Sequence, residues 1–478
     1  MSALGDAESP QSKALGWLLN DPNVANYPDW RIQQRFALMT LYYATSGPTK
    51  WRNNTNWASY EHECEWFSTP SLGPPSFPVD NETLAILLST SPCDPDYVSW
   101  KLNSSRHDDI SLLHLGRYQH LRMEPNGLEG TIPQETFLLT ALREITFGIN
   151  QLSGTLSSEI SKLTDLILFT MPMNKITGTI PTEVFSLTSL RAFYGFRNQL
   201  TGSIPSEVGI SNLQDLFLDS NLLTGTLPSE LGAANPLNNV FMFNNAFSGS
   251  IPSELWTLSS LVRLMVEFNA LTGTLATEIG QMSNLQMLRL DNMELTGTIP
   301  TELGRLQQMG FLRLELNQLS GTIPTDANQL SGYVPSEFGS FSRLKRLGLG
   351  RNMFSSTVPV ELGKLSSLKW LGLHVNELTG AIPTEIGLLG NLTRLWLYGN
   401  EFTGGLPTSL DGLLQLESFN ISQNQYLSGI VPEELCFVEV LAFDCSASLC
   451  GCDCPCGSGN AAGSARNESS SALNSTLQ

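Results

Sequence analysis

The chain has 478 residues, of which 41% are hydrophobic and 15% charged, and its net charge is −19. This composition is typical of a folded protein and excludes general disorder. The acidic balance excludes a nucleic-acid partner, which requires a basic face, and it disfavours an anionic lipid surface. No stretch reaches the 18 apolar residues of a membrane helix, and no signal-peptide-like stretch of 7–15 apolar residues lies between Met1 and Asp29.

Two helices are predicted at the beginning of the chain, where no repeat is found. The first begins at Ser9-Pro10, a capping residue followed by a residue suited to the first turn. The second begins at Asp29 and ends at Gly47-Pro48. Its predicted buried stripe is Ile32, Phe36, Met39 and Tyr43. We expect residues 1–8 to be flexible and residues 9–118 to form a helical N-terminal cap.

A period of 24 residues runs through the chain from residue 119 to residue 432. Each repeat combines spaced leucines with a Gly-x-Ile-Pro group and an asparagine. The asparagine positions are Asn126, Asn150, Asn174, Asn198, Asn221, Asn245, Asn269, Asn317, Asn328, Asn352, Asn376, Asn400 and Asn424, with Met293 in the place of one. Such a repeat cannot bury its apolar face alone, so neighbouring repeats stack. The sequence therefore predicts an α/β solenoid with one continuous parallel β-sheet on its concave face.

Roles within one coil follow from this pattern. In the coil around Asn269 we expect the apolar side chains to point inward, while the asparagine satisfies backbone groups that stacking buries. Gly273 lies where the backbone needs freedom in φ. The inward residues are Leu261, Leu264, Val266, Leu271 and Leu275.

One spacing breaks the period. Asn317 and Asn328 are only 11 residues apart (328 minus 317), and the stretch 317–327 copies the one that follows it. Eleven extra residues can leave the array at modest cost in loop entropy. We predict an irregularity at 317–328, with a local bulge or kink near 317–335.

All eight cysteines lie outside the repeats. Cysteines at both ends of a solenoid predict disulfide-stapled caps in an oxidising compartment. A sulfur-ligated metal is the weaker alternative, because the run from Cys450 to Cys456 is C-x-C-x-C-x-C rather than the separated C-x₂₋₄-C pairs typical of structural zinc. The expected N-terminal pair is Cys64 and Cys93, and the pairing stays open for Cys436, Cys445, Cys450, Cys452, Cys454 and Cys456. Residues 433–456 are the expected Cys-rich C-terminal cap, and residues 457–478 are an expected disordered tail.

Asn-x-Ser/Thr sequons also favour a secretory route. Together with the cysteines they predict an extracellular or cell-surface location, with a cytoplasmic location as the alternative. Since no signal peptide is found, we expect the natural N-terminus to lie further upstream. The sequons are at Asn53, Asn81, Asn103, Asn391, Asn420, Asn467 and Asn474.

The phrase L-x-G-x-I-P-x-E-[LIV]-G, as in residues 295–304, resembles the plant-type leucine-rich-repeat class. Residues 35–47 and 63–67, and the Cys-rich end at 436–456, are similar to diatom leucine-rich-repeat receptor-like proteins. The resemblance implies a right-handed superhelix with a helical N-cap and a Cys-rich C-cap, and a role in signalling or surface recognition. It also implies a membrane helix upstream of residues 9–18.

No catalytic, cofactor or metal motif is found: there is no G-x-S-x-G, H-E-x-x-H, P-loop or kinase set. We expect a protein that is not an enzyme. Candidate binding residues are instead those that alternate with the inward leucines and so face the concave side. Neighbouring apolar side chains there would mark a partner site, unless loops cover them or they only stiffen the face. They are Tyr194, Phe196, Phe217, Phe241, Phe243, Met265 and Phe268.

Two further groups follow on the same face. Arg289 and Arg313 stand beside acidic residues, and cross-strand pairing for stability is favoured over ligand binding. Trp370, His374, Trp396 and Tyr398 could stack on a sugar or a peptide. The sequence thus predicts a receptor-like recognition module for a protein, peptide or glycan. The alternatives are a secreted inhibitor of a cell-wall-degrading enzyme and a structural adhesion or matrix protein, and the oligomeric state stays open.

Overall fold

The computed structural model describes residues 6–51, 119–234, 236–321 and 336–428, and then residues 431, 435, 438 and 440–442. Several expectations lie outside these residues: those for the cysteines, for residues 1–5 and 457–478, and for the sequons at Asn53, Asn81, Asn103, Asn467 and Asn474. The cysteines concerned are Cys64, Cys93, Cys436, Cys445, Cys450, Cys452, Cys454 and Cys456.

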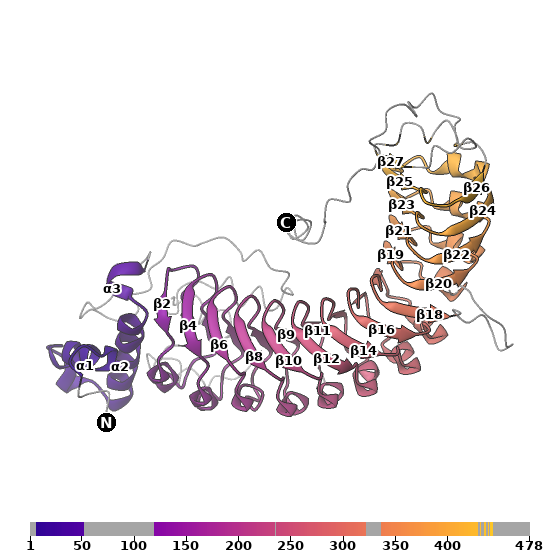
Figure 1. Ribbon diagram of the computed structural model, residues 1–478. Coiled ribbons are helices and arrows are strands. Elements are labelled where there is room, and N and C mark those ends of the chain that lie inside the picture. The colour runs from indigo at the N-terminus through magenta and orange to yellow at the C-terminus, as the bar shows by residue number, and fades with distance from the viewer. Residues whose placement is uncertain are drawn as a thin grey trace, which may run out of the picture.

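In the described part before the repeats, residues 6–51, the chain forms three α-helices, and Figure 1 shows them at one end of a long curved array. They are α1 (Pro10–Leu19), α2 (Asp29–Ala44) and α3 (Gly47–Lys50), with a short 3₁₀ helix η2 (Val24–Asn26) between the first two. The Ser9 side chain caps α1 by accepting a hydrogen bond from the Ser12 N–H at 3.1 Å. Both longer helices therefore begin where the sequence predicts.

Helix α2 is buried over most of its circumference, so the expectation of a single buried stripe was wrong. Residues 37–42 are all buried, whereas Ile32 and Phe36 are only half-buried. The reason is that α2 lies between α1 and the first coil, and its apolar residues join the same core as that coil. Even Arg35 is fully buried; its Nε lies 3.3 Å from the Asp21 carboxylate.

The continuous parallel sheet predicted for the concave face is confirmed, and the repeats form a second parallel sheet that the sequence does not predict. The 14-stranded sheet contains β1 (His120–Arg122), β3 (Glu144–Thr146), β5 (Leu168–Thr170), β7 (Ala192–Tyr194), β9 (Asp215–Phe217), β11 (Asn239–Phe241), β13 (Arg263–Met265), β15 (Met287–Arg289), β17 (Phe311–Arg313), β19 (Arg346–Gly348), β21 (Trp370–Gly372), β23 (Arg394–Trp396), β25 (Ser418–Asn420) and β27 (Val440–Ala442). It lines the concave side of the array in Figure 1.

The second sheet has 13 strands, one after the turn that follows each concave strand from β1 to β25. Its strands are β2 (Glu129–Thr131), β4 (Gln151–Thr155), β6 (Lys175–Gly178), β8 (Gln199–Gly202), β10 (Leu222–Gly225), β12 (Ala246–Ser250), β14 (Ala270–Gly273), β16 (Glu294–Gly297), β18 (Gln318–Gly321), β20 (Met353–Ser356), β22 (Glu377–Gly380), β24 (Glu401–Gly405) and β26 (Tyr426–Ser428). It was not predicted because its short stretches mix polar and apolar residues without a clear alternation.

Short 3₁₀ helices return the chain along the convex side (Figure 1). Most begin directly after a proline whose fixed φ suits the extended entry, such as Pro252 at φ −65°. They are η4 (Gln134–Leu138), η5 (Ser158–Lys162), η6 (Thr182–Val184), η7 (Ser206–Ile210), η8 (Ser229–Ala233), η9 (Ser253–Thr257), η10 (Thr277–Gln281), η11 (Thr301–Arg305), η12 (Ser336–Ser340), η13 (Val360–Lys364), η14 (Thr384–Leu388) and η15 (Thr408–Gly412).

The asparagine position works as the sequence predicts. The Asn269 amide donates to the carbonyl oxygens of Val266 at 2.8 Å and Met242 at 3.1 Å, and its Oδ1 accepts from the Phe247 N–H at 3.0 Å. One side chain thus joins two coils. The inward assignment is also confirmed, since Leu261, Leu264, Val266, Leu271 and Leu275 are at most 5% exposed. Gly273 has the left-handed φ of +86° that a side chain would strain.

The extra residues leave both sheets intact. Strand β17 pairs with β19 at a spacing of 35 residues, as from Arg313 to Gly348, and β18 pairs with β20 at a spacing of 33, as from Gly321 to Phe354. Asn317 occupies the turn position and donates to the Leu290 and Leu314 carbonyls, whereas Asn328 lies outside the described residues. So do residues 322–335, on which most of the predicted bulge falls. The array changes direction near β18–β20 (Figure 1).

Candidate ligand-binding surface

Each concave strand places two side chains on the open face of the sheet. In β13 the central Leu264 is buried, while Arg263 and Met265 point the other way because successive side chains alternate. The residue two positions after the strand, here Glu267, continues the same face. Equivalent residues of neighbouring coils lie about 4.8 Å apart in a parallel sheet, so side chains 24 residues apart in sequence touch.

An aromatic stack occupies the N-terminal part of this face. We use that name for Tyr194, Phe217 and Phe241 on strands β7, β9 and β11. The Tyr194 and Phe217 ring centroids are 4.5 Å apart at 9°, and those of Phe217 and Phe241 are 4.2 Å apart at 7°. The Tyr194 hydroxyl also donates to Asp215 Oδ2 at 3.2 Å.

The stack corrects the expectation of exposed aromatic rings. Tyr194 and Phe217 are each only 7% exposed, because neighbouring rings cover one another and Leu168 and Ala192 pack beside them. Together these side chains form a small apolar cluster separate from the main core. Phe196 and Phe241 are half-buried against this cluster. Most of its apolar surface is therefore used within the protein.

The remaining predicted apolar residues differ in place. Phe243 and Met265 are half-buried on the concave face. Phe268 is not on that face of the sheet: it is the turn residue before Asn269, with a left-handed φ of 56°. Asp219 continues the face between the coils of Phe196 and Phe243, and burial raises its pKa to about 7 against the opposing hydrogen bond from Ser220.

A charge ladder follows, formed by Glu267, Arg289, Asp291, Arg313 and Glu315. Arg289 lies 3.0 Å from Glu267 and 3.4 Å from Asp291, and Arg313 lies 3.3 Å from Glu315 and 3.8 Å from Asp291. The three carboxylates are at most 4% exposed. Both arginines are thus paired across strands, as expected.

The ladder holds three acids and only two arginines. Burial raises the pKa of Glu267 to about 8, although the Arg289 guanidinium opposes the shift. Burial likewise raises the pKa of Glu315. Glu267 and Glu315 therefore bind a proton more readily than ordinary glutamate side chains do.

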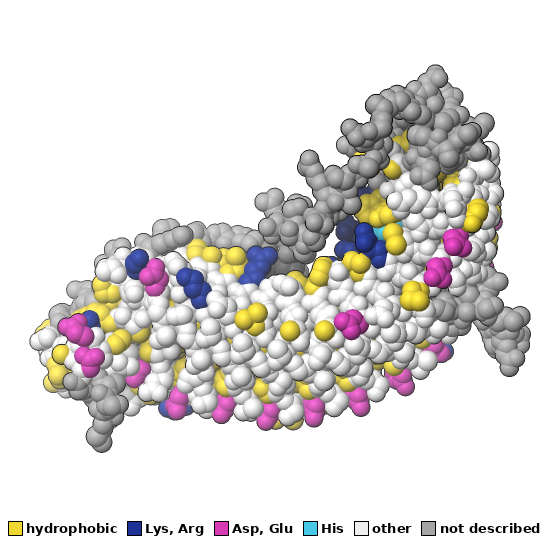
Figure 2. All heavy atoms as spheres, viewed as in Figure 1, with side chains coloured by type: hydrophobic (Ala, Val, Ile, Leu, Met, Phe, Trp, Pro, Cys, Tyr) yellow, Lys and Arg dark blue, Asp and Glu magenta, His cyan; other side chains and the backbone are white. Residues whose placement is uncertain are grey.

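An aromatic–arginine patch lies beyond the ladder, on strands β19 to β23 and the turns after them. We define it as Arg346, Trp370, His374, Arg394, Trp396 and Tyr398. Figure 2 shows Lys and Arg side chains beside hydrophobic ones and a histidine in the hollow of the bend. The rings of Trp370 and Trp396 meet edge to face at 5.6 Å, and Arg313 lies over Trp370 at 5.6 Å.

His374 differs from the expectation because it is only 7% exposed. Its ring stacks on Tyr398 at 4.8 Å, and burial lowers its pKa to about 4. At neutral pH it is an uncharged ring that supports the patch rather than an exposed binding residue. Trp370, Trp396 and Tyr398 are half-buried, so part of each ring stays open to solvent.

Glycines allow these large side chains to lie flat on the sheet. A Cβ at Gly350 would lie 2.3 Å from the His374 ring, and one at Gly372 would lie 2.9 Å from the Trp370 ring. At Gly348 it would lie 2.0 Å from the Glu315 carboxylate. The glycines of β19, of β21 and of the turn after β19 thus leave the space that the side chains of Glu315, His374 and Trp370 occupy.

Arg346 and Arg394 were missed as candidate residues. Both are exposed and both occupy the first position of a concave strand, as Trp370 does. Reading that position in every coil would have found them. Of the two sequons in the described part, Asn391 is exposed and Asn420 is half-buried on β25, where its Oδ1 accepts a hydrogen bond from Ser422.

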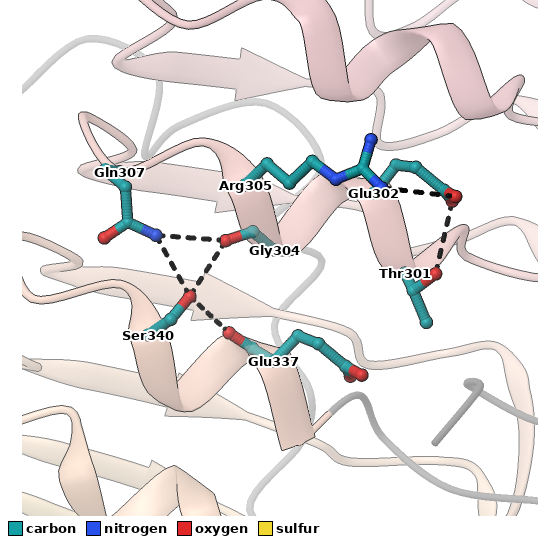
Figure 3. A pocket seen from close by; sticks show the side chains of 7 residues that line it. All are labelled: Thr301, Glu302, Gly304, Arg305, Gln307, Glu337 and Ser340. Carbon is teal, nitrogen blue, oxygen red and sulfur yellow. Dashed lines mark hydrogen bonds and ion pairs between the residues drawn. The ribbon is translucent and has the colours of Figure 1, made fainter. Parts of the chain in front are cut away.

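A pocket of about 400 Å³ lies on the convex side between η11 and η12. Figure 3 shows its lining side chains bonded to one another: Ser340 donates to the Gly304 carbonyl at 2.8 Å, and Gln307 donates to the same oxygen at 3.2 Å. No acid–base pair with an open position is formed. Its lining residues are Thr301, Glu302, Gly304, Arg305, Gln307, Glu337 and Ser340.

Within the described ranges, no group of three or more His, Cys, Asp or Glu side chains is arranged to hold a metal ion. Among those same residues, none of the helices has the length and apolar character needed to span a membrane.

Comparison with known proteins agrees with this geometry. A family model described as Leucine Rich Repeat matches residues 212–234 and 391–413. The array is a leucine-rich-repeat solenoid. No curated protein matches the chain.

Solved structures show similar solenoids. The leucine-rich-repeat ectodomain of the Arabidopsis receptor kinase HAESA, in complex with an N-terminally extended IDA peptide hormone, is 32% identical with a TM-score of 0.62, over 68% of this chain and 53% of that chain. A TDR receptor is 28% identical with a TM-score of 0.64, over 68% and 55%. A leucine-rich-repeat protein of Leptospira interrogans is 29% identical with a TM-score of 0.54, over 68% and 77%. The chain spans about half the length of the two receptors.

Proposed function

We propose that this protein is a non-enzymatic recognition module, a receptor-like ectodomain that binds a peptide segment of its ligand along the concave face. The observation that carries the proposal is the set of half-buried rings on the concave face: Trp370 and Trp396 are in contact on neighbouring coils, and Phe243 lies on the N-terminal side of the charge ladder. Contiguous apolar side chains on a concave surface usually mark partner sites, and aromatic residues dominate binding energies there. The similarity to a peptide-bound ectodomain supports a peptide over a glycan.

The proposal includes an extracellular or cell-surface location. It is supported by the similarity to receptor ectodomains and by the exposed sequon at Asn391. A relation to diatom receptor-like proteins is part of the same proposal and rests on residues 35–47 and 63–67.

The test is selection of binders to the full chain from a random peptide library, with a glycan array beside it. We expect selected peptides to compete with one another and to lose at least tenfold in affinity on Phe243→Ala and Trp396→Ala. Leu388→Ala is the matched control, because Leu388 is a 69% exposed apolar residue of η14 on the convex side. Peptides that bind all variants equally, or binding to glycans alone, would refute the proposal.

A further inference from the structure

The arginines on strands β15 to β23 of the concave face fall into two kinds. Arg289 and Arg313 are neutralised by the buried carboxylates of the charge ladder. Arg346 and Arg394 are exposed, and no ion pair with either is found among the described residues. In a chain with a net charge of −19, these two arginines lie two strands apart on β19 and β23.

These arginines also lie close enough to other guanidinium groups to repel them. Burial lowers the pKa of Arg346, and the charges of Arg394, Arg313 and Arg289 lower it further. Binding of an anion beside a cation that is held among like charges lowers the electrostatic free energy, because attraction to the anion offsets the repulsion between the cations.

Aromatic faces alternate with the two arginines. Along the sheet register Phe311 pairs with Arg346, Arg346 with Trp370, and Trp370 with Arg394. The Arg346 guanidinium lies 5.6 Å over the Phe311 ring, which holds it on the surface. The order along the array is therefore ring, cation, ring, cation.

We propose that Arg346 and Arg394 bind two carboxylate side chains of the peptide ligand, with an apolar ligand residue between them on Trp370. The inference deepens the proposed function and rests on it. Arg–carboxylate hydrogen bonds are charge-assisted and can be bidentate, so two of them fix position as well as affinity. The carboxylates of the charge ladder do not compete with the ligand for Arg346 and Arg394, since they are already paired with Arg289 and Arg313.

The spacing of the arginines specifies the ligand further. Arg346 and Arg394 are two strands apart, which corresponds to about 10 Å at about 4.8 Å per strand. A polyproline II segment repeats every three residues and rises about 9.3 Å over that repeat. Same-face residues of a β-strand are about 6.6 Å apart instead. The ligand is therefore an extended segment with acidic residues at positions i and i+3.

The test uses three octapeptides with an acetylated N-terminus and an amidated C-terminus. Each consists of proline apart from two positions, which carry either Glu or Gln. One carries Glu at i and i+3, one carries Glu at i and i+2, and one carries Gln at i and i+3. We expect the first to bind the full chain at least tenfold more tightly than the others in fluorescence anisotropy, with affinity falling as salt rises.

Protein variants locate the contact. Arg346→Gln and Arg394→Gln should each weaken binding of the first peptide at least tenfold. Arg305→Gln changes the net charge equally on the convex side, where Arg305 lies 4.0 Å from Glu302, and should change affinity less than twofold. The inference would be overturned if the three peptides bound equally or if the first did not bind. It would also be overturned if neither arginine variant weakened binding of the first peptide, or if an oligouronate bound more tightly than that peptide. If peptides from the library still lose affinity on Phe243→Ala and Trp396→Ala in that case, the proposed function is kept and only the role of the two arginines is rejected. If no library peptide loses affinity on these substitutions, the proposed function is rejected as well.

Discussion

Phe217 and Phe241 stack face to face across β9 and β11, with ring centroids 4.2 Å apart and planes within 7°. Because Tyr194 covers the other face of Phe217, the central ring is a buried member of the concave surface rather than an open contact. Phe217 therefore mainly stabilises the fold, whereas Phe243 lies outside the stack and is half-buried, so part of its ring stays accessible.

Phe217→Ala should destabilise the protein, because it removes ring contacts on both sides and leaves a cavity. We expect a loss of about 3 kcal/mol in the free energy of unfolding by urea titration. Phe243→Ala is the matched control and should cost less than about 1 kcal/mol, as surface substitutions do. Equal losses for the two variants would contradict the structural role of the stack.

Met293 replaces the asparagine of one coil and is 6% exposed. At the same position of the neighbouring coil, Asn317 donates to Leu290 and accepts from the Leu295 N–H. Met293→Asn should restore such bonds to its own coil and raise the free energy of unfolding by about 1 kcal/mol, since the new bonds exceed the lost apolar burial.

The reciprocal change, Asn269→Met, should lower it by about 3 kcal/mol, because several buried backbone groups lose their partner. Asn284→Ala removes one exposed bond to the Ser259 carbonyl and serves as the control. A destabilised Met293→Asn variant would show that this coil has adapted to methionine.

Stability should fall as pH rises from about 5 to about 8. Burial raises the pKa of Asp219 to about 7 and that of Glu267 to about 8, while unfolded carboxyl groups titrate near about 4. Between these values the folded protein holds protons that the unfolded chain has released, so raising the pH favours unfolding.

Urea titrations at pH 5 and pH 8 measure this difference. Asp219→Asn and Glu267→Gln should each make it smaller, because the amide cannot lose a proton. Glu401→Gln, at an exposed position on β24, is the control and should leave it unchanged. A wild-type protein that is more stable at pH 8 would reverse the sign and refute the explanation.

Two buried tryptophans differ in their hydrogen bonds. Trp256 is fully buried, and its Nε1 has no hydrogen-bond partner, whereas the Trp51 Nε1 donates to the Thr45 carbonyl at 2.9 Å. Trp256→Phe should change the free energy of unfolding by less than about 1 kcal/mol, because removal of an unsatisfied donor offsets the lost volume. Trp51→Phe should cost about 2 kcal/mol, since it loses the bonds to both the Thr45 carbonyl and the Thr45 hydroxyl together with part of the buried ring. Thermal unfolding of both variants measures the two losses in stability. A larger loss for Trp256→Phe than for Trp51→Phe would be inconsistent with an unsatisfied donor at Trp256.

Much of the fold follows from the 24-residue period itself. A strand buries every second residue, so the repeat alone indicates that Leu264 and Val266 point inward and that Met265 does not. The asparagine position is equally local, because an amide next to a tight turn can reach the backbone of its own and the preceding coil. Extended stretches such as β14 were missed, since their pairing depends on the neighbouring coil and not on their own pattern.

The sequence by itself determined the solenoid, its concave strands and the residues that can face the open side, because these depend on periodicity alone. Only the tertiary structure decided which of those residues stay accessible. Tyr194 is covered by a ring 23 residues away, and Arg289 is paired with Glu267 of the adjacent coil and with Asp291, while Arg346 is left without such a carboxylate in the described part. The physical reason is that exposure and charge on a sheet depend on the side chains of the adjacent coils, which a single repeat does not encode.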